Sequence, residues 1–373
     1  MKTLKILISV PLNKRNFERF DIDIYLNFFD KIQIYHIHEG INFKKDKIFN
    51  HKKIEIFKIN NYLKLFQLLK IEKVPVYLDY TLPGLKSCIF KIVLYFKDFK
   101  KIISKIGHIP DPKIRKFNFN IKIKRIFNLI NIKFFNLIEE TFFTKKNIYL
   151  CAGKKIQNQY KDRFIINCHS YDLNEKLKLK KKSNIKNNYF LYLDQYEHNH
   201  PDYKYANQKM VNPKIFYKSL NTFFDKIEKK FKKKVIIAAH PKAKKHPYFG
   251  NRKVISNRIV ELSKNCFSTI AHTTTSISFS IIFNKPIIFI VNDEMLRVDS
   301  KKIQKISSFT KELSSQIFNI DENNYIDEIN QHLQGINKKK YDNYYKNYIS
   351  HKVNNNKKIG EIICDIYSKK RPY

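Results

Sequence analysis

Residues 235–291 read VIIAAHPKAKKHPYFGNRKVISNRIVELSKNCFSTIAHTTTSISFSIIFNKPIIFIV, and this stretch decides the fold. Apolar runs at 235–239, 266–271 and 286–291 predict three strands, and an apolar helix is expected to start at Ser276, between the last two. Strand, polar loop, helix and strand in this order are typical of a parallel α/β sheet. Ligands bind beyond the carboxyl ends of the strands in such sheets, and two polar clusters follow predicted strands here.

The first polar cluster is His240-Pro241-Lys242. Pro241 stiffens the turn and is expected to fix the imidazole of His240 just past the strand end. A histidine at this place can donate to a phosphate or protonate a leaving oxygen, and Lys242 adds a positive charge. The alternative interpretation is an ordinary loop histidine in a basic protein.

The second polar cluster begins at His272 and continues through four consecutive hydroxyl residues to Ser276. Thr274, Thr275 and Ser276 can cap the following helix and direct N–H and O–H groups towards an anion. One capping residue would satisfy any helix, so four hydroxyls in a row favour a ligand site over capping alone. We therefore expect His272, Thr274, Thr275 and Ser276 to bind an anionic phosphate.

A further polar loop follows the strand predicted at 189–193 and begins with Asp194. A carboxylate at a strand end can act as a catalytic base or a hydrogen-bond acceptor, although it can also simply form the turn. His198, His200 and Asp202 have spacing that could hold a divalent ion. Because no further carboxylate or cysteine cluster accompanies them, the sequence predicts no metal site.

The chain is strongly basic, with a net charge of +40 over 373 residues. Only nine of its 73 basic residues are arginine, the better bidentate partner of phosphates and bases, and no nucleic-acid-binding module is visible. The excess of lysine is therefore interpreted as a bias in amino-acid composition that affects the solvated surface. The alternatives are that these lysines bind a polyanion or an anionic membrane surface. The segment 89–106 is predicted to be a basic amphipathic helix that suits peripheral contact with a bilayer.

Several absences limit the function classes that the sequence allows. The five cysteines lack CxxC spacing, which argues against zinc, and the apolar contexts of three of them predict buried reduced thiols in a cytoplasmic protein. The sequence has no run of 18 apolar residues, so no transmembrane helix is predicted. It also lacks a GxGxxG motif and a P-loop, so no dinucleotide cofactor is expected.

The predicted elements fall into two strand-rich halves separated by the lysine-rich segment 176–186. We expect an α/β protein with two Rossmann-like domains, at 1–175 and 187–335, that face one cleft, followed by a helical segment at 336–373. The first domain is expected to supply the acceptor side of that cleft. The candidate residues on that side are Asn13, Lys14, His169 and Asp172.

Residues 163–291 resemble bacterial surface-polysaccharide glycosyltransferases, in particular sialyltransferase-like enzymes that use CMP-activated acidic sugars. The motifs of the resemblance are Asp194-Gln195, His240-Pro241 and Thr275-Ser276. The resemblance implies a GT-B arrangement, in which Asp194 is the general base, His240 contacts the nucleotide phosphate or assists the leaving group, and Thr275 and Ser276 hold the same phosphate. The acidic motif of that family carries two acids and a glycine, whereas this chain has Asp194-Gln195-Tyr196.

The sequence thus predicts a metal-independent glycosyltransferase of capsule or lipopolysaccharide assembly, cytoplasmic or at the inner face of the inner membrane. Its donor is expected to be a CMP-linked sialic-acid- or Kdo-like sugar, and its acceptor a glycan or lipid-linked glycan. No nucleic acid is expected as a partner. Two alternatives remain at this point: a GT-B transferase with a UDP-sugar, GDP-sugar or CDP-polyol donor, and a non-enzymatic polyanion-binding protein.

Overall fold

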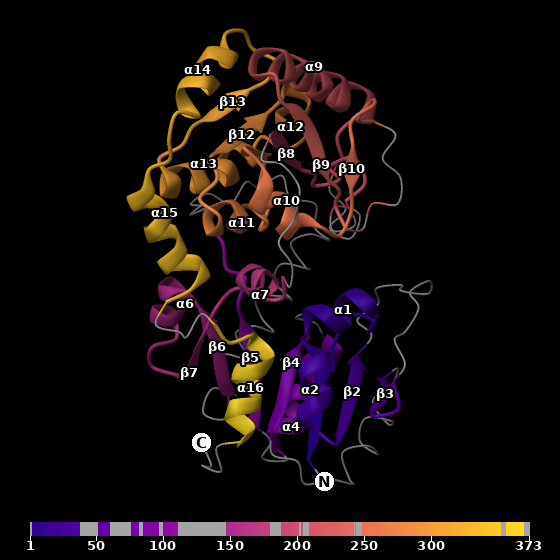
Figure 1. Cartoon of the computed structure of the whole chain (residues 1–373). Coiled ribbons are helices and arrows are strands. Elements are labelled where there is room, and N and C mark those ends of the chain that lie inside the picture. Colours follow the sequence, from indigo (N-terminus) through magenta and orange to yellow (C-terminus); the bar gives the residue numbers. More distant parts are fainter. Residues whose placement is uncertain are drawn as a thin grey trace, which may run out of the picture. The chain divides into compact units, whose positions relative to one another are not determined.

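The computed structural model of the chain is shown in Figure 1. It describes residues 2–37, 51–59, 76–81, 85–96, 100–110, 147–179, 188–200, 203, 209–241, 243, 248–351 and 356–368. The chain divides into two compact units. Unit 1 comprises Met1–Ile106, Asn118–Asn174 and Ser350–Tyr373, and unit 2 comprises Gly107–Phe117 and Glu175–Ile349. The division therefore falls just before the expected linker 176–186, and the last residues return to unit 1.

Unit 1 is built on a parallel sheet with the strand order β3-β2-β1-β4-β5-β6-β7. The strands are β1 (Thr3–Ile8), β2 (Lys31–Ile37), β3 (Ile54–Ile59), β4 (Val76–Tyr80), β5 (Lys100–Lys105), β6 (Asn147–Ala152) and β7 (Phe164–Cys168). The helices are α1 (Lys14–Arg19), α2 (Ile22–Phe28), α4 (Leu85–Phe96), α6 (Lys154–Gln159), α7 (Tyr171–Leu177) and α16 (Ile359–Ser368). The first strand is central and the chain winds outwards from it in both directions, which is the doubly wound topology of a Rossmann-like domain.

The expected basic helix at 89–106 is corrected by the structure, because α4 ends at Phe96 and Lys100–Lys105 form the strand β5. Lys91 and Lys101 are buried rather than solvated. The ammonium of Lys91 lies 3.1 Å from the buried carboxylate of Asp79. Burial alone would raise the pKa of Asp79, but the charges of Lys91 and Lys101 lower it. Lys91 and Lys101 therefore face the interior of unit 1 and are not part of a solvated helix face.

The C-terminal helix α16 packs against α2 within unit 1 (Figure 1). Its first backbone N–H groups are held by buried polar side chains: Asp21 accepts from Gly360 at 2.9 Å, and Asn174 accepts from Ile359 at 2.8 Å. Gly360 permits this close approach, since a Cβ there would lie 2.8 Å from the Cβ of Asp21. Helix α16 is thus an integral part of unit 1.

Unit 2 contains a second parallel sheet with the strand order β10-β9-β8-β11-β12-β13. The strands are β8 (Tyr189–Leu193), β9 (Lys234–Ala238), β10 (Val254–Ile255), β11 (Ser268–Ala271), β12 (Ile287–Val291) and β13 (Ile317–Asn319). Strands β8, β11 and β12 are buried along their whole length. Strand β8 is the first of this unit and lies between β9 and β11, so the winding direction reverses beside it.

The helices of unit 2 follow the apolar periodicity of the sequence. They are α9 (Pro213–Phe231), α10 (Ile259–Asn265), α11 (Ile277–Ile282), α12 (Asp293–Val298), α13 (Lys302–Leu313), α14 (Tyr325–His332), α15 (Lys338–Tyr344) and the π-helix η2 (Tyr345–Ile349). Helix α9 has its proline at the first position, where the missing N–H costs nothing. No helix of the described residues combines the length and the apolar character that a membrane crossing requires.

Candidate functional site

The candidate site lies at the carboxyl edge of the sheet in unit 2, where three neighbouring strands end. In the register of the sheet, Leu193 of β8 pairs with Ala238 of β9, and Tyr192 pairs with Ile270 of β11. Asp194, His240 and the hydroxyl residues after His272 therefore follow strands that end side by side. This is the reversal point of a doubly wound sheet, where such folds bind their ligands.

Asp194 anchors the loop that follows β8. Its Oδ1 accepts the backbone N–H of Tyr196 at 2.9 Å, and its Oδ2 accepts that of His240 at 3.4 Å. The side chain is 8% exposed, and this burial raises its pKa to about 6 although the two N–H groups oppose the shift. A carboxylate with such a pKa is ionised at neutral pH but still basic enough to accept a proton.

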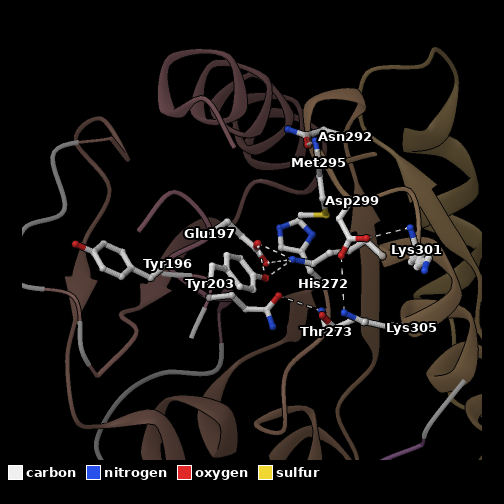
Figure 2. Close-up of polar contacts among 12 residues, drawn as sticks. Tyr196, Glu197, Tyr203, His272, Thr273, Asn292, Met295, Asp299, Lys301 and Lys305 are labelled. Carbon is white, nitrogen blue, oxygen red and sulfur yellow. Dashed lines mark hydrogen bonds and ion pairs between the residues drawn. The ribbon is translucent and has the colours of Figure 1, made fainter. Parts of the chain in front are cut away.

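Gln195 connects the same loop to the hydroxyl residues. Its side-chain carbonyl accepts the backbone N–H of Thr273 at 3.1 Å, and Figure 2 shows Thr273 with this bond. Asp194 holds the start of the His240 turn while Gln195 holds the start of the hydroxyl run. Two consecutive residues after β8 thereby bring together clusters that are more than thirty positions apart in the sequence. No local pattern indicates this role for Gln195, although it directly follows Asp194 in the sequence.

His240 occupies a tight turn, as expected from Pro241. The carbonyl of His240 accepts the N–H of Ala243 at 2.9 Å, and Pro241 occupies the second position of the turn, where its fixed φ is favoured. The imidazole is half-buried, and its ring centroid lies 4.9 Å from that of His200. Pro241 is exposed, and Lys242 lies outside the described residues.

The hydroxyl run forms the turn that leads into α11. The hydroxyl of Thr274 accepts the N–H of Ser276 at 3.2 Å, and the carbonyl of Thr274 accepts the N–H of Ile277. Thr275 is exposed and Ser276 is half-buried. No described residue accepts a hydrogen bond from the hydroxyl of either one. Both hydroxyls can therefore donate to a ligand at this edge.

The expected contact of His272 with a ligand is corrected, because the ring of His272 is 0% exposed. Its Nδ1 lies 2.6 Å from the carbonyl oxygen of Ile290, and its Nε2 lies 3.0 Å from the hydroxyl of Tyr192. Burial lowers the pKa of His272 to about 4, so the ring is neutral at pH 7, with Nδ1 donating and Nε2 accepting. It holds β8, β11 and β12 together beneath the site.

A buried ion pair between Glu197 and Lys302 also holds the loop that follows β8. Figure 2 shows Glu197 and Tyr203 beside His272, and the ammonium of Lys302 donates to Glu197 Oε1 at 2.7 Å and to the hydroxyl of Tyr203 at 2.6 Å. Burial would raise the pKa of Glu197, but the charge of Lys302 and the hydrogen bonds lower it. This pair could not be predicted, since nothing in the sequence near Lys302 distinguishes it from the many other lysines.

The candidate acceptor-side residues all belong to unit 1. Asn13 caps α1, because its side chain accepts the N–H of Asn16 at 3.0 Å, and the next residue, Lys14, is exposed. Asp172 is half-buried in the first turn of α7. His169 is corrected: it is 0% exposed, and its Nε2 lies 2.8 Å from the carbonyl oxygen of Lys357, so it ties down the C-terminal segment.

Among the residues that the structure describes, no group of three or more His, Cys, Asp or Glu side chains could hold a metal ion. His198, one half of the HxH pair, has its Nδ1 2.8 Å from the hydroxyl of Tyr217, and Asp202 lies outside the described residues. The five cysteines are free and buried, and burial raises the pKa of Cys266 to about 12.

The two doubly wound units define the GT-B class of fold, and solved structures of that class resemble the chain along nearly its whole length. One is the UDP-GlcNAc 2-epimerase of Methanocaldococcus jannaschii in complex with UDP-GlcNAc and UDP, with a TM-score of 0.52, 14% identity, and coverage of 98% of this chain and 99% of that one. A second is a variant of the wall teichoic acid polymerase TagF, with a TM-score of 0.55, 14% identity, and coverage of 99% and 88%.

A third similar structure is a putative UDP-N-acetylglucosamine 2-epimerase from Listeria monocytogenes, with a TM-score of 0.52, 9% identity, and coverage of 100% of this chain and 99% of that one. No protein-family model and no curated protein matches the chain. At these identities the likeness establishes the GT-B fold. The activity has to be argued from the site itself.

Proposed function

We propose that this protein is a glycosyltransferase of bacterial surface-glycan assembly that binds a nucleotide-activated donor at the carboxyl edge of the sheet in unit 2. The observation that carries the proposal is a pair of hydrogen bonds to side chains of the loop after β8. Asp194 accepts the backbone N–H of His240, and Gln195 accepts the backbone N–H of Thr273. These bonds place a basic turn and a set of hydroxyl donors at one strand edge. Such a set suits the phosphate of a nucleotide.

The chemistry required of the site is modest, because a sugar nucleotide already carries a good leaving group. In the proposed reaction Asp194 accepts the proton of the acceptor hydroxyl, and that oxygen attacks the anomeric carbon as the bond to the phosphate oxygen breaks. His240, with Thr275 and Ser276, stabilises the charge that develops on the departing phosphate. No metal is needed for this division of roles. Asn13, Lys14 and Asp172 remain the proposed acceptor-side residues.

For the donor we propose a CMP-linked acidic sugar, following the order of the three motifs. The alternative is a UDP-sugar, a GDP-sugar or a CDP-polyol. The epimerase complex with UDP-GlcNAc and UDP, and TagF structures soaked with CDPG, are the reason for keeping that alternative, because those two proteins of similar fold were solved with such ligands. The nucleotide is therefore the first property to test.

Thermal stabilisation by free nucleotides distinguishes these donors. At about 100 times its Kd, CMP is expected to stabilise the protein by about 2.7 kcal/mol, and UDP and GDP by less. A variant with Thr275→Ala and Ser276→Ala is expected to lose most of this stabilisation. The control is Thr222→Ala, which removes an exposed threonine from α9 and should respond like the wild type.

The outcomes of this measurement assign the function class. Stronger stabilisation by UDP or GDP would replace the CMP donor with the alternative. Absence of any nucleotide effect, together with tight and steeply salt-dependent binding of nucleic acid, would instead support the polyanion-binding alternative. A Thr275→Ala, Ser276→Ala variant with an undiminished response to CMP would place the phosphate elsewhere.

The pH dependence of turnover tests the role of Asp194. Because burial raises the pKa of this carboxyl to about 6, turnover is expected to rise with pH through that value as the base becomes ionised. Asp194→Asn should lower turnover and remove this rise from the residual activity. Asp225→Asn, which changes an exposed carboxylate bonded to Arg252, serves as the control and should keep it. Persistence of the rise in Asp194→Asn would assign the base to another residue.

A further inference from the structure

Tyr196 has a backbone conformation that tyrosine rarely adopts. Its φ is 56°, in the left-handed region that favours glycine, and a bulky side chain there is costly. The other non-glycine residues with positive φ in the described part of the chain have polar or charged side chains: Asp21, Lys232, Asn257, Asn284, Ser314 and Asn324. Tyr196 is the aromatic member of this set, and it lies in the candidate site.

The conformation of Tyr196 is fixed at three points within its own loop. Its N–H donates to Asp194 Oδ1 at 2.9 Å, and its carbonyl accepts the N–H of Asn199 at 2.9 Å. Its phenolic oxygen accepts the side-chain amide of Asn199 at 2.7 Å. Backbone strain that is held this firmly is commonly found at functional sites.

The left-handed backbone directs the phenol ring of Tyr196 towards the imidazole of His240. The two rings are nearly parallel, with an interplanar angle of 10° and centroids 6.2 Å apart. The imidazole of His240 also lies beside the ring of His200, at 4.9 Å and 58°. On its far side Tyr196 meets the ring of His198 edge-on, at 4.7 Å and 79°. The ring of Tyr196 therefore forms one wall of the space that His240 occupies.

We propose that Tyr196 is a positioning residue that holds the imidazole of His240 in the orientation needed at the donor phosphate. The proposal rests on the function proposed above and adds the reason why a tyrosine stands where the related motif carries a glycine. Glycine would relieve the backbone strain but would leave the imidazole without its parallel neighbour. The chain retains the strained residue because the orientation of His240 depends on its ring.

The test compares Tyr196→Asn with Tyr196→Phe. Asparagine tolerates the left-handed backbone, so Tyr196→Asn removes the ring without adding strain, whereas Tyr196→Phe keeps the ring and loses only the bond to Asn199. Tyr196→Asn is expected to lower kcat by about 100-fold with little change in nucleotide Kd, as a misplaced catalytic group does. Tyr196→Phe is expected to keep turnover near the wild-type level, and both variants should remain folded, with only the small loss of Tm that removing one hydrogen bond causes.

A second readout does not depend on activity. Nuclear magnetic resonance gives the imidazole pKa of His240, whose signal is assigned by its loss in His240→Gln. This pKa is expected to shift in Tyr196→Asn and to stay constant in Tyr196→Phe. An unchanged imidazole titration in Tyr196→Asn would overturn the proposal, as would equal loss of turnover in both variants. A wild type inactive with every nucleotide donor would refute the proposed function, and the imidazole titration would then decide the role of Tyr196 alone.

Discussion

Replacing His240 by alanine is expected to lower turnover by about 100- to 1,000-fold, the usual contribution of a group that stabilises charge developing in the transition state. The loss follows because the half-buried imidazole lies at the strand edge where the donor phosphate is proposed to bind. The fold should survive, since the bonds that hold the turn are made by the backbone of His240. Steady-state kinetics together with circular dichroism of the same sample would measure both effects.

The matched control is His332→Ala. His332 lies on α14, and its Nε2 is 2.9 Å from the carbonyl oxygen of Ile287, the first residue of β12, at the opposite edge of the same sheet. Its removal is expected to lower stability slightly and to leave kcat unchanged. If His240→Ala keeps wild-type turnover, or if it loses no more than His332→Ala, the imidazole takes no part in the transfer. A polyanion-binding protein would also be insensitive to His240→Ala.

Breaking the Glu197–Lys302 pair is expected to cause the largest loss of stability, about 3–5 kcal/mol for Glu197→Ala. The side chains of Glu197 and Lys302 are only 2% and 5% exposed, so the variant leaves an ammonium buried without its carboxylate. Replacing both residues by methionine should recover much of the loss, because no buried charge then remains unpaired. Urea unfolding of the single and double variants gives the free energies of unfolding.

The exposed pair Lys230–Asp327 provides the comparison for this prediction. Its side chains are 45% and 79% exposed, and Asp327→Ala should therefore cost no more than about 1 kcal/mol. The interpretation of the buried pair fails if Glu197→Ala costs as little as Asp327→Ala. A double methionine variant as unstable as Glu197→Ala would show that the stabilisation comes from the hydrogen bond of Tyr203 to Glu197 rather than from charge pairing.

Local patterns in the sequence were sufficient for much of the fold. The strand predicted at 189–193 coincides with β8, and the strand predicted at 286–291 coincides with β12 to within one residue. A fully buried strand appears in the sequence as a short, continuous run of apolar residues, which a short window of sequence reveals. The same patterns located Asp194, His240 and Thr275 at strand ends, because each polar cluster directly follows an apolar run.

The predictions that failed concern residues whose partners are distant in the chain. Lys91 and Lys101 were assigned to a solvated helix face, but both are buried and lower the pKa of Asp79. His272 and His169 were assigned to ligands, but their rings are buried and contact backbone carbonyls. A polar residue in an apolar segment has the same local signature whether it faces a ligand or a buried partner.

The sequence by itself determined the two-unit α/β architecture and the strand ends at which the polar clusters lie, because hydrophobic periodicity is a local property. Only the tertiary structure decided that β8 lies between β9 and β11, so that Asp194 reaches His240 and Gln195 reaches Thr273. It alone also paired Glu197 with Lys302 and turned the ring of Tyr196 towards His240. Strand order and side-chain burial arise from long-range packing, which no short window of residues encodes.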